Sequence, residues 1–353
     1  MLCRNVLHEF TDRFGHELRR PLMVYFFASS GEMSVLFRNS FAAAAVIGGD
    51  LIVLGADAYA DRAEVIRHEL AHLFSSYWRT TRPRFLEERL ATWLMQTLDG
   101  KPIDLYAILA LVTDRYLFLN WLLDPWVFYY RSQQSYVLAG SFTGWLIDRF
   151  GWDRYRDYYR SARQKHFTAD FEKIYGLSLL AAERQWREQL LQKRPAFEPE
   201  VTQLLPQHRI ESALVAGHFY RLLEESAPLI EAGKAGERVL SCAAWARALL
   251  GDYAEAAVLL IQALEHDDAR ERSRGPGSFS LANLYDLQAR RDEAIQEYQK
   301  VLLEPDDWHQ DVGSLHAAAR TYLKRPFTES DLKNLMMRTP LFRVRDEARA
   351  PLG

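Results

Sequence analysis

The sequence predicts an α+β domain over residues 1–200, followed by an all-α helical domain over residues 201–353. The only convincing strand segments lie within residues 21–54, where apolar runs are bounded by Gly, Asp or Ser. From residue 61 almost to the end of the chain the apolar residues follow a helical period. A Pro-containing stretch, residues 194–199, separates the two parts. A small sheet followed by helices is typical of the α+β class.

Three strands are expected in the first part. Their sequences are PLMVYFFAS, AAAAVIGG and DLIVLG, which span residues 21–29, 42–49 and 50–55. Each is a short apolar run that ends in small or turn-forming residues, as strands in a folded core do. We therefore expect a small sheet that precedes the helices.

The first helix after these strands carries two histidines four residues apart. We expect it to begin at Asp61, which has the side chain of an N-cap, and to run to about Trp78. At 100° per residue, His68, Glu69 and His72 share one arc. The apolar residues gather on another arc, which comprises Ile66, Leu70, Leu73, Phe74 and Tyr77. The polar arc is therefore expected to face a cleft or solvent.

His68-Glu69-Leu70-Ala71-His72 is an HExxH motif. Two imidazoles four residues apart on a helix lie on one face, so both can bind one Zn²⁺. Glu69, beside the first histidine, can act as the general base on the attacking water. The motif predicts a zinc site, and the alternative is a pair of solvated histidines on an amphipathic helix.

A zinc hydrolase site needs a third protein ligand. The candidates are Glu87 and Glu88, in a second helix that is expected to begin after Pro83. Helix geometry places Glu87 near the centre of the apolar arc of this helix and Glu88 at its edge. A carboxylate at the buried centre needs a metal or an arginine as its partner. Geometry alone therefore leaves both residues open.

HELAH followed by FLEERLATW resembles the gluzincin zinc metallopeptidases, most closely their peptidase-MA-like branch. This resemblance implies a thermolysin-like or gluzincin-like catalytic domain over residues 1–200. The second motif of that branch reads W-L-x-E-G-L-A-x-Y, and its register on Leu90 and Ala91 implies that Glu88 is the third ligand. Arg89 stands where the branch has Gly, which puts a bulky cation beside the metal ligand. The activity of the site is therefore left open.

Residues 136–151 are similar to a later helix of the same branch. Ala139 and Gly140 share a helical face with Tyr136, and small residues on such a face let another helix approach closely. The resemblance implies that Tyr136 donates a hydrogen bond to the tetrahedral oxyanion, as a Tyr or His does in gluzincins. The alternative is an aromatic residue packed in a helix interface.

The second part of the chain contains a weak internal repeat, in which residues 251–268 superpose on residues 289–307. The matched pairs are Ala256 with Ala294, Leu260 with Tyr298, and Ala263 with Val301. This pattern resembles the second helix of a tetratricopeptide (TPR) unit. It predicts a TPR-like helical domain that binds a protein partner or presents substrate, and the alternative is a generic helical bundle.

Charge and hydropathy exclude several classes of protein. The net charge is -3, the pI is near 6.4, and no block of like charge occurs, so nucleic acid is not an expected partner. The longest uncharged stretch, residues 132–147, is too short and too polar to span a bilayer. No secretory signal is visible, so a cytoplasmic location is expected. Cys3 and Cys242 are the only cysteines and are expected to be free thiols.

These patterns together predict a zinc-dependent metallopeptidase that acts on a peptide or protein substrate. Aminopeptidase members of the family carry a G-x-M-E-N segment whose Glu binds the free α-amine, and this chain has AVIGGD in that region. The resemblance therefore implies an endopeptidase. The competing hypothesis is a catalytically degenerate peptidase-fold scaffold for protein–protein interaction. Hydrolysis of a non-peptide amide or ester is a further alternative.

Overall fold

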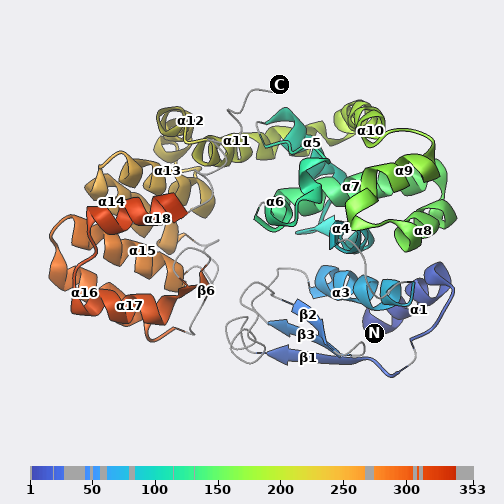
Figure 1. The fold of residues 1–353 in the computed structure, drawn as a ribbon. Helices are drawn as coiled ribbons and strands as arrows, with labels where there is room; N and C mark the ends of the chain where they lie inside the picture. Colours follow the sequence, from blue (N-terminus) through green and yellow to red (C-terminus); the bar gives the residue numbers. More distant parts are fainter. Residues whose placement is uncertain are drawn as a thin grey trace. The chain divides into compact units, whose positions relative to one another are not determined.

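The computed structural model describes residues 2–18, 20–27, 44–47, 51–55, 62–78, 84–113, 115–130, 132–266, 274–304, 308–309 and 313–338 (Figure 1). Contacts divide the chain into two compact units. The described residues up to Leu204 form the first unit, and those from Leu205 onwards form the second. The division falls inside helix α11 (Glu198–Val215), which also contains the predicted boundary at residue 200. Val201, just after that boundary, is completely buried.

Three short strands form a mixed sheet in the first unit. They are β1 (Met23–Phe27), β2 (Ala44–Ile47) and β3 (Leu51–Gly55), in the order β1-β3-β2. β3 pairs in parallel with β1 and antiparallel with β2, so Tyr25 and Ala45 both lie opposite Val53. The three strands expected from the sequence are confirmed within the described residues.

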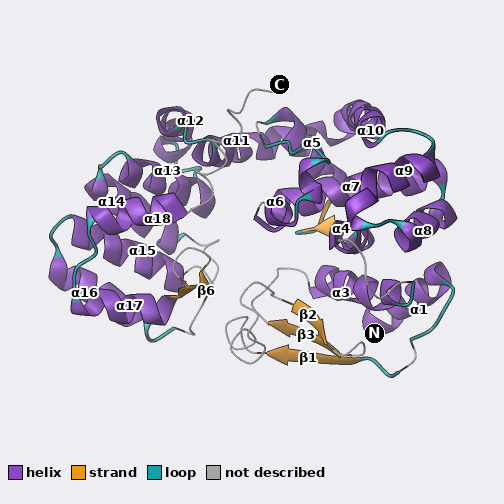
Figure 2. Cartoon of the chain, in the orientation of Figure 1, coloured by secondary structure: helices purple, strands orange, loops and turns teal. Residues whose placement is uncertain are grey.

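The predicted α+β class with a thermolysin-like catalytic domain is wrong. Besides these three strands, the described part of the first unit contains only helices and the two-residue strands β4 (Thr97–Leu98) and β5 (Lys101–Pro102) (Figure 2). The described part of the chain is therefore mostly helical. The α+β class was predicted from three strand segments followed by helices, but these segments form only a small sheet of short strands beside many helices. The thermolysin-like domain was implied by the likeness to gluzincin motifs, which specify two helices and leave the amount of sheet beside them undetermined.

Helices make up most of the remaining described residues of the first unit. They are α1 (Leu2–Phe14), α3 (Arg62–Ser76), α4 (Arg84–Met95), α5 (Ile103–Val112), α6 (Pro125–Tyr130), α7 (Ser132–Phe150), α8 (Trp152–Ser161), α9 (Phe167–Tyr175) and α10 (Leu179–Lys193). Short 3₁₀ turns occur at Trp121–Leu123, Gln164–His166 and Arg194–Phe197. α3 packs against α1, α4 and β2, and α4 packs against α7 as well.

The apolar arc predicted for the first motif helix faces the core of the unit. Four of its members are at most 3% exposed, namely Ile66, Leu70, Leu73 and Phe74, and Tyr77 is half-buried. Phe10 and Phe14 of α1 pack on Phe74 with ring centroids 5.7 and 5.4 Å away. Burial of these side chains stabilises the pairing of α1 with α3. The predicted N-cap Asp61 lies outside the described residues, and α4 begins at Arg84, directly after Pro83, as expected.

Two glycines of α7 set its distance from α4. A Cβ atom at Gly140 would lie 2.7 Å from Thr92 Cγ2, and one at Gly144 would lie 2.9 Å from the ring of Trp93. Both distances are shorter than van der Waals contact, so the two helices can approach this closely only where α7 carries no side chain. The close helix approach expected at Gly140 is therefore observed.

The second unit is helical throughout its described residues apart from the two-residue strands β6 (Trp308–His309) and β7 (Gly313–Ser314). Its helices after α11 are α12 (Phe219–Glu231), α13 (Glu237–Leu249), α14 (Tyr253–Glu265), α15 (Arg274–Leu287), α16 (Arg291–Val301), α17 (Leu315–Lys324) and α18 (Glu329–Arg338). α13 packs against α14, and α15 packs against α16. The six matched residues of the internal repeat are all buried in these two pairs. Membership of the TPR class stays a prediction.

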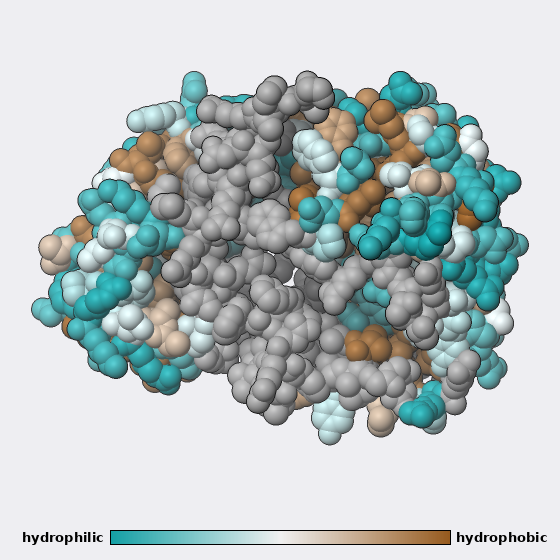
Figure 3. Space-filling view, viewed as in Figure 1, coloured by the Kyte–Doolittle hydropathy of each residue, from teal (hydrophilic) through white to brown (hydrophobic). Residues whose placement is uncertain are grey.

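The surface near α8 and α9 is mostly hydrophilic (Figure 3). α8 explains this pattern because its charged residues Asp153, Arg154 and Asp157 are exposed, whereas its tyrosines are buried. Among the described residues, no helix combines the length and the apolar character needed to cross a membrane.

Candidate metal centre

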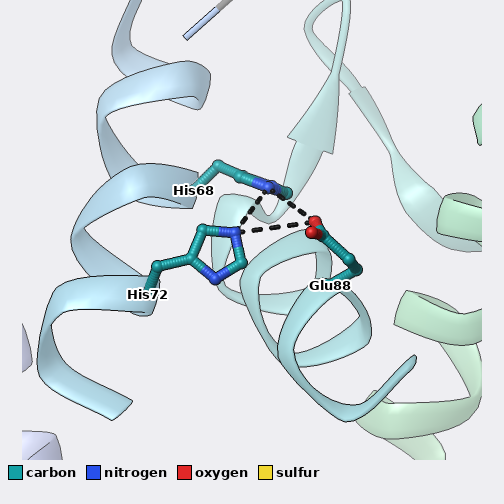
Figure 4. Close-up of side chains that lie close together, drawn as sticks. All are labelled: His68, His72 and Glu88. Atoms are coloured by element: carbon teal, nitrogen blue, oxygen red, sulfur yellow. Dashed lines mark hydrogen bonds and ion pairs between the residues drawn. The ribbon is translucent and has the colours of Figure 1, made fainter. Parts of the chain in front are cut away.

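Helices α3 and α4 bring three donor side chains together (Figure 4). His68 Nε2 lies 3.2 Å from His72 Nε2, and Glu88 Oε2 lies 3.3 Å from the first nitrogen and 3.5 Å from the second. All three side chains are half-buried, and their ligand atoms lie within 4.8 Å of one another. This group could hold a metal ion.

The backbone beneath the site is fixed by Arg67, the residue before His68. Its Nε donates to the carbonyl of Leu94 at the end of α4, at 2.9 Å. Its two terminal nitrogens donate to the carboxylate of Glu9 on α1, at 2.9 and 2.8 Å. These hydrogen bonds from Arg67 hold the pKa of Glu9 below its usual value. One guanidinium thus joins α1, α3 and α4 around the histidines.

The imidazoles and the Glu88 carboxylate shift one another's pKa values. Burial by itself would lower the pKa of His72, but the nearby carboxylate of Glu88, together with Glu69 and Glu87, raises it to about 9. Burial by itself would raise the pKa of Glu88, but its contacts with the two histidines hold this pKa well below its usual range. A cation that binds between these side chains therefore has to displace a proton from an imidazole.

Glu69 lies on α3 beside the donor group. Only 7% of this residue is exposed, and burial raises the pKa of its carboxyl group, an effect opposed by the charges of His72 and His68. The sequence placed Glu69 on an arc facing a cleft or solvent, and the structure buries it. A buried carboxylate with a raised pKa is suited to accept and return a proton near neutral pH.

Tyr136 of α7 also lies beside the group. The centroid of its ring is 6.2 Å from that of His68 and 5.1 Å from that of Phe128. The side chain is half-buried. The predicted catalytic residues Glu69 and Tyr136 are thus both close to the histidines.

Glu87 and Glu88 differ in their relation to the histidines. Both are half-buried, but among the described residues the donor group includes Glu88 and not Glu87. The motif register pointed to Glu88, whereas helix geometry left both residues open. The arrangement of side chains agrees with the register.

Arg89 occupies a different face of α4. It is completely buried, and its guanidinium carbon lies 5.2–5.8 Å from the ring centroids of Phe85, Tyr155, Tyr158 and Phe167. Within the described part of the chain it makes no ion pair with Glu88. The hypothesis that this arginine crowds the metal ligand therefore gains no support from the structure.

The buried tyrosines of α8 and the partner of Ser75 were not predicted from the sequence. Tyr159 donates a hydrogen bond to Ser75 Oγ at 3.0 Å, and Tyr155 receives one from Arg89 Nε at 3.3 Å. The segment WDRYRDYYRS carries a usable signal, since its aromatic residues recur at helical spacing between charged ones. That period marks a buried face, but it does not reveal what the face contacts.

A comparison with protein-family models, curated proteins and solved structures found no match to this chain. No relative therefore assigns a family or names the metal. The ligand atoms on α3 and α4, with Glu69 and Tyr136 beside them, are the features of this chain that bear on its function.

The two adjacent glutamates provide a matched test of the ligand set. We expect Glu88→Gln to weaken metal binding by at least about tenfold, because an amide replaces the carboxylate that faces both imidazoles. Glu87→Gln should change the affinity much less. Titration of the two purified variants with Zn²⁺ against a chromophoric chelator measures the zinc dissociation constant of each. Equal losses, or a larger loss in Glu87→Gln, would show that the ligand assignment is wrong.

Proposed function

We propose that the first unit is a zinc-dependent metallopeptidase of the gluzincin type that cleaves peptide bonds. The observation that carries this proposal is the convergence of His68 Nε2, His72 Nε2 and Glu88 Oε2, with the buried carboxylate of Glu69 beside them. Two imidazoles and one carboxylate are the ligand set of many zinc hydrolases, which keep a fourth position for water or substrate.

The spacing of the donor atoms supports zinc. In a tetrahedral site with bonds of about 2.0–2.2 Å, ligand atoms lie about 3.3–3.6 Å apart. The three separations between His68, His72 and Glu88 are 3.2, 3.3 and 3.5 Å. Nitrogen and carboxylate donors in this number suit zinc better than calcium or magnesium, which prefer six or more oxygen ligands.

Each side chain then has a role in hydrolysis. A zinc ion held by His68, His72 and Glu88 would polarise the substrate carbonyl and lower the pKa of a water molecule. Glu69 takes the proton from the attacking water and delivers it to the leaving amine. Tyr136 donates a hydrogen bond to the oxyanion that develops on the carbonyl oxygen.

The substrate is proposed to be an internal peptide bond. The chain lacks the family's acidic anchor for a free α-amine in the segment that corresponds to it, so an endopeptidase is favoured over an aminopeptidase. We further propose that the two units are separate domains, and that the helix pairs of the second bind a protein partner or present substrate. Antiparallel helix pairs commonly serve as protein-binding surfaces.

The direct test is the metal content. Protein purified without chelator should contain about one zinc ion per chain, because the site has one set of three ligands. His72→Ala should lose the metal, while His166→Ala, which removes an exposed histidine of the same unit, should retain it. Elemental analysis by mass spectrometry measures the stoichiometry. Absence of zinc from wild-type protein incubated with excess Zn²⁺ and then desalted would refute the proposal.

A further inference from the structure

Helix α8 contacts both helices that carry the metal ligands. Its residues Trp152, Tyr155 and Tyr159 lie on one face, at helical spacing. The ring of Trp152 lies 5.3 Å from that of Trp78, just after α3, and 5.9 Å from that of Trp93 on α4. Tyr155 takes part in a hydrogen bond with α4, and Tyr159 takes part in one with α3.

The link to α4 passes through Arg89, the neighbour of Glu88. Its Nε donates to the hydroxyl of Tyr155, and four aromatic rings surround its guanidinium. Its other two nitrogens have no hydrogen-bond partner among the described residues. An arginine keeps its charge even when buried, so the ring faces and the single phenol oxygen must stabilise it.

The burial of Arg89 among aromatic rings constrains the direction in which the Glu88 side chain points. Consecutive residues of a helix point about 100° apart, so Glu88 faces α3 while Arg89 faces α8 and α9. A rotation of α4 that moved Glu88 away from the histidines would also pull the guanidinium off its rings. Such a movement would leave a buried charge poorly stabilised, which is costly.

The link to α3 passes through Ser75. Tyr159 donates to Ser75 Oγ at 3.0 Å, and Ser75 Oγ donates to the carbonyl oxygen of His72 at 3.4 Å. Tyr159 and Ser75 are at most 1% exposed, so water cannot easily replace either hydrogen bond. The C-terminal end of α3, adjacent to His72, is thereby connected to α8.

We propose that Tyr155 and Tyr159 are positioning residues, which hold α4 and α3 at the separation that the metal ligands require. This inference rests on the metal site of the proposed function. Tyr155 acts through its hydrogen bond with Arg89, and Tyr159 acts through its hydrogen bond with Ser75. Residues that do not bind the metal but hold its ligands in place can change metal affinity by fixing the orientation of those ligands.

The test compares three Tyr→Phe substitutions on one helix. Tyr155→Phe and Tyr159→Phe remove the hydroxyls that face α4 and α3 and keep the rings. Tyr158→Phe is the matched control, because its buried hydroxyl donates to the carbonyl of Phe167 instead. We expect the Tyr155→Phe, Tyr159→Phe double variant to bind Zn²⁺ about tenfold more weakly than wild type. Tyr158→Phe should stay within about twofold of wild type.

A second measurement separates positioning from a general loss of stability. Co²⁺ bound in place of zinc has visible absorption bands that report ligand geometry. The double variant should show shifted or weakened bands even when saturated with Co²⁺, at a temperature well below its unfolding midpoint. Tyr158→Phe should show the wild-type spectrum, whatever its unfolding midpoint.

The outcomes distinguish the inference from the function on which it rests. If wild type binds zinc but the double variant has the same affinity and Co²⁺ spectrum, positioning by α8 is refuted and the metal site stands. Zinc binding that is weakened equally by Tyr155→Phe, Tyr159→Phe and Tyr158→Phe would also refute it, since the effect would then not depend on the hydrogen bonds toward α3 or α4. If wild type binds no metal, both proposals fail.

Discussion

Glu69→Gln should reduce hydrolysis of an unstructured protein substrate by at least about 10²-fold, the lower end of what a positioned general base contributes. The amide has nearly the same shape as the carboxylate but cannot accept the proton of the attacking water. Because Glu69 lies outside the donor group of His68, His72 and Glu88, the zinc content should not change. Turnover of a fluorogenic casein, measured beside zinc analysis of the same samples, tests both expectations.

The pH profile provides an independent check on the same residue. Burial raises the pKa of Glu69, and a general base works only when deprotonated. The activity of wild type should therefore rise with pH, and the midpoint of this rise should lie above about 4.3, the ordinary pKa of a Glu side chain. Wild type that shows no such rise would argue against Glu69 as the general base.

Two outcomes of the Glu69→Gln comparison would contradict the proposed function. Wild type that holds zinc but shows no hydrolysis would favour the scaffold hypothesis. Hydrolysis that is equal in wild type and Glu69→Gln and insensitive to chelator would indicate a contaminant.

Arg89→Gly should destabilise the first unit by at least about 3 kcal/mol, although it introduces the residue that the similar gluzincin motif has at the matching position. The substitution empties the space among Phe85, Tyr155, Tyr158 and Phe167, and the resulting cavity is costly. Glycine in the interior of α4 adds about 1 kcal/mol through its greater flexibility when unfolded. Chemical denaturation followed by circular dichroism measures the change in the free energy of unfolding.

Arg89→Met is the matched control for volume. It fills most of the space without a charge, and replacing a buried ion by an apolar side chain is often nearly neutral. We expect its free energy of unfolding to lie much closer to that of wild type. An Arg89→Gly protein as stable as wild type and more active would revive the hypothesis that the arginine crowds Glu88.

Local periodicity explains what the sequence could predict of the site. His68 and His72 lie on one face because they are four residues apart on a helix, a relation that depends on no distant contact. Periodicity left Glu87 and Glu88 open on the next helix, and the resemblance to the gluzincin motif, registered on Leu90 and Ala91, implied Glu88. The strands near residues 21–54 were also predictable, since short apolar runs between turn residues are a local signal.

Contacts between distant segments explain what the sequence could not predict. The rings around Arg89 come from α8 and α9 as well as from α4, so nothing near position 89 indicates why an arginine is buried there. The link from Tyr159 to Ser75 likewise joins helices that are far apart in the chain. The α+β class was wrong because the three strand segments form only a small sheet beside many helices. The thermolysin-like domain was wrong for a related reason, because motif likeness carries information about two helices and little about the rest of the unit.

Helix α11 sets a limit on how this chain can be divided for expression. A fragment ending at residue 200 would delete Val201, which is completely buried, and would cut the helix within its first turn. Such a fragment would expose apolar surface and invite aggregation. A fragment ending after Val215 keeps the whole of α11, but it separates Ile210 and Ala213 from the core of the second unit, in which both are buried. One continuous helix thus supplies buried residues on both sides of the division, and a cut at the proline-containing stretch or at the end of the helix uncovers some of them.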